Sequence, residues 1–214
     1  GVDVLTVNTG VLGTTDLFPI EIEADDVARL AGVTLQSLRE NGDRGQAMAV
    51  MAQGAEATAT KLYAEGRIDA VFGMGGSGGT TMVTAAMRCL PLGVPKVCVC
   101  TVASGDTSGY VGASDIVLFP SATDVSGINR ISRVTYTNAV GALLGMLQTE
   151  VPKSQDDRPI VVASMFGNTT ACVDQCRGLL DSRGFEVLVF HAVGTGGQTM
   201  ESLIDQGLVD ACLD

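Results

Sequence analysis

The strongest constraint on the fold is a glycine-rich motif, Gly75-Gly76-Ser77-Gly78-Gly79-Thr80, which lies between two largely apolar segments. Residues 69–74 form a short run typical of a buried strand, and residues 81–90 are typical of a helix. Glycines leave backbone N–H groups uncovered, and the N-terminus of a helix favours an anion. The motif therefore predicts a strand–loop–helix unit with a phosphate or nucleotide site. The alternative is a tight turn that only lets strand and helix pack closely.

Composition limits the possible partners. The chain has 214 residues, is 46% hydrophobic and carries a formal net charge of −11. Clustered Lys and Arg, which nucleic acids and anionic membranes require, are absent from the sequence, so neither partner is expected. No apolar run approaches the roughly 20 residues needed to span a bilayer, and we expect a soluble globular protein. Any anionic ligand must then be held by backbone N–H groups and a few local cations.

The six cysteines predict a reducing compartment rather than a disulfide scaffold. Cys98 and Cys100 share one face of a predicted strand, and Cys172 and Cys176 share one face of a predicted helix. A zinc site would need further ligands, and the sequence contains a single histidine. We therefore expect reduced core thiols, a cytoplasmic protein and no metal site built from protein ligands.

The rest of the chain alternates between predicted strands and helices. Strands are predicted at residues 2–7, 96–101, 115–119, 159–165, 186–190 and 209–213. Helices are predicted at residues 43–65, 129–148 and 169–183, and a further helix follows the second glycine-rich loop and ends at about residue 206. The acidic segment at residues 23–40 is expected to be partly helical. Asp43 is the expected N-cap of the first long helix and Gly66 its stop. This alternation predicts βαβ units and parallel sheets with helices on both faces.

A polar segment at residues 149–158 is the best candidate for a linker. It separates a first lobe, residues 1–148, from residues 159–214, which form the start of a second lobe. The two parts resemble each other, because residues 184–195 are similar to 1–14 and residues 207–214 to 66–73. On this comparison the first lobe lacks a strand and helix equivalent to 159–183. The second lobe stops where the glycine motif of the first would begin. We therefore expect a piece of a two-lobe protein that is truncated at both ends.

Three further loops are expected beside the glycine motif, because ligands of open α/β sheets bind outside the carboxyl ends of the strands. They are residues 8–15, 101–107 and 120–129, which are rich in Gly, Ser, Thr and Asp. Their hydroxyl and N–H groups could hold phosphate and ribose. Asp106 or Asp124 could meet Mg²⁺, which prefers oxygen ligands, or each could simply cap a turn.

The nearby basic residues have alternative roles. Arg130 and Arg133 lie three apart on one helix face, where they could clamp a phosphate or form ordinary surface salt bridges. Lys96, just before a predicted strand, is expected to be exposed to solvent.

The motif also satisfies Gly-x-Ser-x-Gly, the pattern of a serine-hydrolase nucleophile. Ser77 would be the nucleophile, with Asp115 or Asp124 and then His191 following in the required order. His191 lies beyond the linker, so a different lobe would have to supply the base. A serine hydrolase is therefore the alternative function, and no residue is assigned as catalytic.

Several blocks of the sequence resemble one known family. The blocks in the first lobe are the glycine motif and residues 86–88, 93–96, 101–105, 110–115 and 124–132. In the second lobe they are residues 165–167 and 190–192, with Gly194, Gly196 and Gly197. In this order, from residue 1 to 214, they resemble the Tm-one-like ATP-binding domain family, which is named for a plant protein that inhibits replication of tomato mosaic virus.

The resemblance implies an α/β protein with two Rossmann-like lobes, ATP bound in the first lobe, and self-association as a dimer. In the plant member it also implies contact with a viral replication protein. The nucleotide-binding role is carried over to the following residues of this sequence: Gly75, Gly76, Ser77, Gly78, Gly79, Thr80, Thr101, Ala103, Ser104, Gly105, Asp115, Asp124 and Asn129. The chain lacks the strand and Gly-Thr-Ala-Asp-Thr-Lys loop with which the family opens.

No residue of the sequence stands out as a base or as a second cation at a transferring phosphate. The expected function is therefore the binding of ATP, with Mg²⁺ as its candidate counterion, in a regulatory or interaction role. Enzymatic turnover is not assigned.

Overall fold

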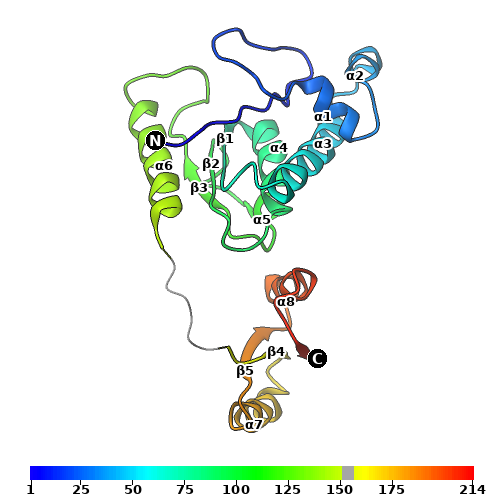
Figure 1. Cartoon of the computed structure of the whole chain (residues 1–214), viewed down its shortest axis with the longest axis vertical. Helices are drawn as coiled ribbons and strands as arrows, with labels where there is room; N and C mark the ends of the chain where they lie inside the picture. Colours follow the sequence, from blue (N-terminus) through cyan, green and yellow to red (C-terminus); the bar gives the residue numbers. More distant parts are fainter. Residues whose placement is uncertain (151–156) are drawn as a thin grey trace. The chain divides into compact units, whose positions relative to one another are not determined.

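The computed structural model describes residues 1–150 and 157–214, and the chain separates into two compact units, residues 1–149 and 150–214 (Figure 1). Most of the predicted linker at 149–158 lies outside the described residues. Each unit is built on a three-stranded parallel sheet flanked by helices. This architecture confirms the predicted α/β class with Rossmann-like lobes.

Unit 1 carries the glycine motif. Its elements in chain order are α1 (Ala24–Leu30), α2 (Leu35–Asn41), α3 (Arg44–Ala64), β1 (Val71–Gly75), α4 (Ser77–Arg88), β2 (Lys96–Cys100), α5 (Ser108–Val111), β3 (Val117–Pro120) and α6 (Ser132–Gln148). The strands pair in the order β1-β2-β3, so their carboxyl ends, including Gly75, lie at one edge.

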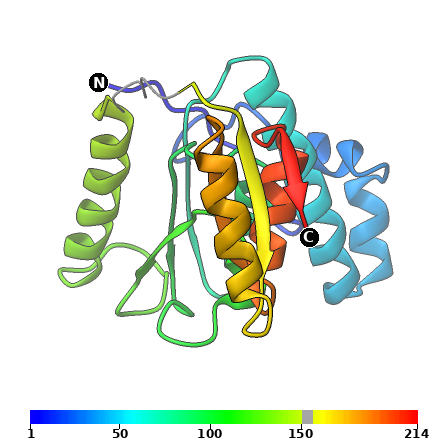
Figure 2. The ribbon, with the colours of Figure 1, turned by 90° about the horizontal axis from the view of Figure 1, so that it is seen from below.

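The central strand β2 shows why both faces of this sheet are covered. Val97 and Val99 pack against α6, whereas Cys98 and Cys100 pack against α4 on the opposite face. All four side chains are completely buried. Because successive strand residues point to opposite faces, an uninterrupted apolar run suits a strand that is covered twice. Figure 1 shows α6 and α4 on opposite sides of the sheet, and Figure 2 shows α6 and α3 at the two flanks of unit 1.

Helix α3 begins and ends where the sequence predicts. The Asp43 carboxylate accepts the N–H of Gln46 at 3.0 Å and so caps the first turn. Gly66 ends the helix in the left-handed conformation, with φ of 64°. The N–H of Arg67 then donates back to the C=O of Leu62 at 2.9 Å. This turn fixes Arg67 over the end of α3.

The predicted strand at residues 2–7 is wrong. This extended segment is largely exposed and forms one isolated parallel bridge, between Val7 and Ile22. The C=O of Thr6 accepts the N–H groups of Glu21 and Ile22, both at 3.2 Å. A strand pattern is realised only where another strand lies beside it, and none of the described strands pairs with this segment.

Unit 2 repeats the layered arrangement. It contains β4 (Ile160–Met165), α7 (Thr170–Asp181), β5 (Glu186–His191), α8 (Thr195–Asp205) and β6 (Ala211–Leu213). The parallel strands lie in the order β5-β4-β6, and α7 and α8 cover opposite faces (Figure 1). Buried Val161, Ala163 and Val187 of the sheet pack with Val173 of α7.

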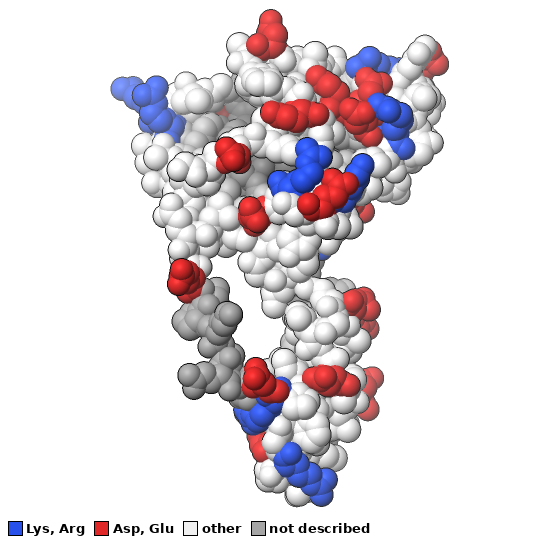
Figure 3. Space-filling model, in the orientation of Figure 1, with Lys and Arg blue, Asp and Glu red and all other residues white. Residues whose placement is uncertain are grey.

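Charged side chains are unevenly distributed over unit 1. Figure 3 shows acidic and basic groups intermingled over α1–α3 and a largely uncharged flank along α6. Arg133 is the one charged residue among the 17 residues of α6. No helix among the described residues combines the length and apolarity needed to cross a membrane.

Lys96, expected to be exposed, is instead completely buried at the start of β2. Its ammonium group donates to the C=O of Pro91 at 2.7 Å, to the C=O of Val94 at 3.0 Å and to the carboxylate of Asp115 at 2.6 Å. The second carboxylate oxygen of Asp115 accepts the N–H of Gly93 at 2.8 Å. A buried ammonium needs such partners, because burial without them carries a large desolvation cost. The ion pair ties the turn before β2 to the residues before β3.

Lys96→Met should therefore destabilise unit 1. The substitution leaves the Asp115 carboxylate and two carbonyls without their donor, and we expect a loss of about 3 kcal/mol in the free energy of unfolding. The double variant Lys96→Met/Asp115→Asn should recover part of this loss, because no uncompensated charge remains. Urea unfolding measures both variants, and wild-type stability of Lys96→Met would contradict the structural role of the pair.

Two helical glycines provide a matched test of packing. A Cβ added to Gly54 of α3 would lie 2.2 Å from the carbonyl oxygen of Val27 in α1, whereas one added to Gly141 of α6 would have nothing within 4 Å. We expect Gly54→Ala to destabilise the unit by roughly 2–3 kcal/mol through overpacking. Gly141→Ala should stabilise it by about 0.5–1 kcal/mol, because alanine is the better helix former. Chemical unfolding distinguishes the two, and equal effects would argue against the close α1–α3 contact.

Candidate functional site

The glycine motif is the junction between β1 and α4. β1 ends at Gly75, Gly76 is the N-cap, and α4 begins at Ser77. A Cβ on Gly75 would lie 2.8 Å from the Cα of Gly79. Close packing of strand and helix therefore explains Gly75. It does not explain Gly76 or Gly78, where an added Cβ would meet nothing closer than 3.2 Å.

The first turn of α4 presents unpaired backbone donors. The N–H of Thr80 bonds to the C=O of Gly76 at 2.8 Å, but Gly76 has no side chain that could cap the preceding N–H groups. No acceptor within the described part of the chain is recorded for the N–H groups of Ser77, Gly78 and Gly79. The buried Thr80 hydroxyl donates to the C=O of Gly76 at 2.8 Å and so stabilises the turn. An anion at this point would receive donors that protein groups leave unused.

A cavity of about 580 Å³ opens beside this turn. Gly78 and Gly79 form one wall, and the others come from the first turns of α3, the end of α2 and residues 10–13. Its apolar lining includes Val11, Leu12, Leu38, Ala47, Met48, Met51 and Met82. The cavity therefore joins a polar helix terminus to an apolar surface.

Two cations reach the same cavity. Arg39 and Arg44 both line it, together with Asp43, whose carboxylate is engaged in capping α3. The Arg39 Nε donates to the C=O of Val11 at 2.7 Å. Within residues 1–150 and 157–214, no carboxylate forms a recorded ion pair with Arg44. Arg44 was not predicted as a site residue. Its position directly after the predicted N-cap Asp43 placed it at the start of a helix, but the sequence did not show that this helix begins beside α4.

Helices α3 and α4 run side by side in the same direction. A Cβ on Gly78 would lie 3.2 Å from Cε of Met48 and 3.8 Å from an Nη atom of Arg44, so the two helices start together. Farther along, Cys89 Sγ lies 3.4 Å from the C=O of Glu56. The positive ends of both helix dipoles therefore point to the same edge, where an anion would relieve their repulsion.

Residues 10–13 are positioned by one side chain. The Asn8 Oδ1 accepts the N–H of Gly10 at 2.8 Å, and the Asn8 Nδ2 donates to the C=O of Gly13 at 3.1 Å and to Glu23 at 3.1 Å. The loop at 8–15, expected beside the glycine motif, thus contributes to the same cavity as Gly78 and Gly79.

The second predicted loop lies on the other side of the motif. The N–H of Thr101 donates to the C=O of Gly75 at 3.3 Å, and a Cβ on Gly76 would be 3.9 Å from the Thr101 hydroxyl oxygen. Ala103 packs on the buried cluster of Met87, Cys98 and Cys100, while Ser104 and Gly105 are exposed in the following turn. Thr101 is thus the member of this loop that the structure brings next to the glycines.

Asp106, Asp124 and Asn129 are engaged in local turns. Asp106 accepts the N–H and hydroxyl of Ser108, at 3.0 and 2.6 Å, and these hydrogen bonds hold its pKa below the ordinary value. Asp124 accepts the N–H of Val125, and the Asn129 side chain caps α6 by accepting the N–H of Ser132, both at 2.9 Å. None of the recorded contacts of the described residues joins these three to the glycine motif.

Asp115 lies at the opposite edge of the sheet. It pairs with Lys96 at the amino end of β2, whereas Gly75 lies opposite Cys100 at the carboxyl end. β2 spans about 13 Å between these ends. Asp115 therefore lies away from the expected phosphate site, and its ion pair with Lys96 indicates a structural role.

Comparison with known proteins follows the division into two units. Residues 1–152 match the N-terminal domain of Uncharacterised protein family UPF0261, and residues 158–214 match the C-terminal domain of the same family. The chain belongs to the UPF0261 family. A UPF0261 protein of Clostridium tetani is 42% identical over 214 residues, which is all of this chain and 53% of the relative. One from Mesorhizobium japonicum is 43% identical over 206 residues, covering 95% of this chain and 50% of the relative.

The chain is also similar to proteins of tomato. The ToMV resistance protein Tm-1(GCR237) of Solanum lycopersicum is 43% identical over 176 residues, which is 80% of this chain and 23% of that protein. The resemblance to Tm-one-like proteins is thereby confirmed. The chain spans about half the length of the bacterial UPF0261 relatives it matches.

Within unit 1 of this UPF0261 chain, no histidine lies beside Ser77, the nucleophile of the alternative serine-hydrolase function. Ser77 belongs to unit 1, which contains no histidine, and His191 belongs to unit 2. The Nδ1 of His191 accepts the N–H of Val193 at 3.3 Å, and its ring meets the edge of Phe166 at 6.1 Å between centroids. Among the contacts of the described residues, none links Ser77 to an imidazole or a carboxylate, so unit 1 does not assemble a catalytic triad.

The Asp115 carboxyl predicts a pH dependence of stability. Burial raises its pKa, but hydrogen bonds from Lys96 and from the N–H of Gly93 outweigh burial and leave the pKa below the ordinary value. A carboxyl with a depressed folded-state pKa stabilises the fold fully above its unfolded pKa of about 4, and this contribution is lost as pH falls through the folded-state pKa. The free energy of unfolding should therefore fall more steeply below pH 4 in the wild type than in Lys96→Met/Asp115→Asn. Urea titrations across this range test it, and parallel curves would contradict it.

Proposed function

We propose that unit 1 binds ATP in the cavity at the N-termini of α3 and α4, with Mg²⁺ as the counterion of the phosphates. The observation that carries the proposal is the convergence of unpaired N–H groups, two helix N-termini, Arg39 and Arg44 on one cavity. A volume of about 580 Å³ lies within the range of small-molecule sites, roughly 300–1,000 Å³.

The charge distribution supports a phosphate ligand. The chain carries a net charge of −11, so an anion is repelled by most of its surface and attracted only where cations and donors gather. Arg44 offers a planar guanidinium to phosphate oxygens, and the N–H groups of Ser77, Gly78 and Gly79 offer fixed donors. Thr101 offers a hydroxyl on the far side of Gly76.

The apolar half of the cavity supports a nucleotide rather than free phosphate. Met48, Met51 and Met82 line it, and methionine packs well against aromatic rings. A purine base against these side chains would leave the phosphates at the helix termini. Adenine as the base is proposed from the resemblance to the Tm-one-like ATP-binding domain family.

A regulatory or interaction role is proposed in preference to turnover. Asp106 and Asp124 are engaged in turns, and Asp43, the carboxylate that lines the cavity within the described residues, is engaged in capping α3. We further propose that the protein self-associates as a dimer and works in the cytoplasm. The cysteine spacing of the sequence, which lacks the density of a disulfide scaffold, supports a reducing compartment.

Calorimetric titration tests the nucleotide site. Mg-ATP, Mg-GTP and phosphoenolpyruvate are titrated into the whole chain and into Arg44→Gln and Gly78→Val. We expect saturable ATP binding that weakens about tenfold or more in Arg44→Gln, because one charge-assisted contact is lost. Gly78→Val should bind still less, because its side chain projects toward Met48 and Arg44.

Arg177→Gln is the control, since it removes one exposed guanidinium from α7 in unit 2. Thermal melts confirm that each variant is folded. Absence of ATP binding, or equal binding by all variants, would contradict the proposed site. Labelling of Ser77 by a fluorophosphonate probe, lost in Ser77→Ala, would favour the hydrolase alternative instead.

A further inference from the structure

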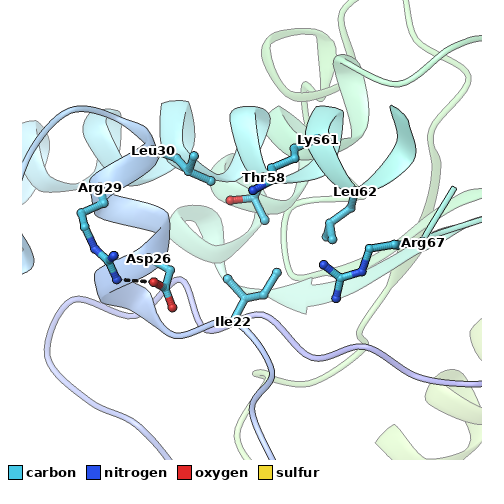
Figure 4. Close-up of a pocket in the computed structure, with 8 residues that line it drawn as sticks. All are labelled: Ile22, Asp26, Arg29, Leu30, Thr58, Lys61, Leu62 and Arg67. Atoms are coloured by element: carbon cyan, nitrogen blue, oxygen red, sulfur yellow. Dashed lines mark hydrogen bonds and ion pairs between the residues drawn. The ribbon is translucent and has the colours of Figure 1, made fainter. Parts of the chain in front are cut away.

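A second cavity, of about 340 Å³, lies toward the other end of α3. Figure 4 shows Asp26, Arg29 and Leu30 of α1, Thr58, Lys61 and Leu62 of α3, and Ile22 and Arg67 from the adjoining segments. The residues from Arg44 at the start of α3 to Lys61 span roughly 25 Å along the helix. This cavity is therefore distinct from the proposed nucleotide site.

Three of its lining residues are cations, Arg29, Lys61 and Arg67, and one is an acid, Asp26. Arg29 and Asp26 pair with each other, as the dashed line in Figure 4 marks. Three of the 13 basic residues of an acidic chain thus gather around one small space.

The other two cations share a single carboxylate. Lys61 lies 4.0 Å and Arg67 3.7 Å from Glu65. Both separations exceed the roughly 2.7–2.9 Å of a charge-assisted hydrogen bond, so Glu65 holds neither cation tightly. Among the described residues, the recorded ion pairs at this cavity thus match three cations with two carboxylates.

Arg67 is placed by the backbone. The left-handed Gly66 turns the chain, and the N–H of Arg67 bonds to the C=O of Leu62 at 2.9 Å. In Figure 4 the guanidinium of Arg67 extends toward Ile22. The turn thereby places the backbone of Arg67 at the rim of the cavity, while its side chain stays about half exposed beside the apolar wall.

The floor of the cavity is apolar. Leu62 is 4% exposed, Ile22 is half-buried, and Leu30 is 44% exposed beside them. The hydroxyl of Thr58 is satisfied internally, because it donates to the C=O of Gly54 at 2.7 Å. The lining thus combines an apolar surface with cations at its rim.

We propose that this cavity binds a small organic anion, with its apolar body on Ile22, Leu30 and Leu62 and its carboxylate or phosphate held by Lys61 and Arg67. The two cations would exchange their long contacts with Glu65 for direct hydrogen bonds to the ligand. The volume lies at the low end of small-molecule sites, so the ligand is smaller than a nucleotide.

The competing explanation is that Lys61 and Arg67 only neutralise the negative end of the α3 dipole. That role would stabilise the helix but would bind nothing. The two explanations differ in ligand binding, which is measured directly.

The test uses 4-methylpentanoate and its neutral analogue 4-methylpentanamide, with inorganic phosphate as a third probe. Each is titrated into the ¹⁵N-labelled chain, and the dissociation constant is taken from amide shifts around the cavity. We expect saturable binding of the carboxylate, weakened by added salt, and binding of the amide at least about tenfold weaker, because the charge-assisted contacts are lost. Phosphate binding comparable to that of the carboxylate would show that charge alone is recognised and would overturn the role of the apolar floor.

Lys61→Gln and Arg67→Gln should each weaken carboxylate binding about tenfold. Both side chains are more than half exposed, so the variants should remain folded, which a thermal melt checks. Arg177→Gln is the matched control, because Arg177 is similarly exposed and forms an equally long ion pair, 3.8 Å, with Asp181. It should bind as the wild type does.

Arg44→Gln and saturating Mg-ATP should leave carboxylate binding unchanged, so failure of the nucleotide proposal is distinguishable from failure of this one. No saturable shift, equal affinity for acid and amide, or wild-type binding by both Lys61→Gln and Arg67→Gln would overturn the proposal.

Discussion

The backbone of α4 approaches β1 so closely that one added carbon at Gly75 would lie 2.8 Å from the Cα of Gly79. This approach lets the strand pass into the helix through a single residue, Gly76, with no longer loop between them. The helix therefore starts directly at the carboxyl edge of the sheet. Its uncapped N–H groups, the neighbouring start of α3 and Arg44 all meet there as a consequence.

The sequence was sufficient for features that depend on local chemistry. The N-cap Asp43 and the left-handed Gly66 bracket α3 as predicted, because both act within one helical turn of their partners. The predicted strand at 96–101 was recognised from its apolar residues, because a doubly covered strand needs no polar alternation; residues 96–100 form β2 and Thr101 is exposed. The glycine motif was placed correctly between strand and helix, although most of it proved to be the first turn of α4.

Features that depend on distant partners were not predictable. Lys96 is buried because Asp115, 19 residues away, and the carbonyls of Pro91 and Val94 surround its ammonium group. Arg44 joins the candidate site because α3 packs parallel to α4, and helix direction is not encoded in either helix alone. The assignment of residues 2–7 as a strand failed for the same reason. In unit 2, β5 and β6, which resemble residues 2–7 and β1, pair with β4 and not with each other.

The alternation of β2 also separates the thiols of the chain by accessibility. Cys98 and Cys100 have no exposed surface, and burial raises the pKa of Cys98 to about 12, so that thiol stays protonated. Cys172 and Cys212 of unit 2 are exposed. A thiol reagent would therefore reach these exposed cysteines, and Cys89 of unit 1, in the folded chain, whereas Cys98 and Cys100 would react only when α4 lifts from the sheet. The rate at which Cys98 and Cys100 are modified would therefore report how often unit 1 opens.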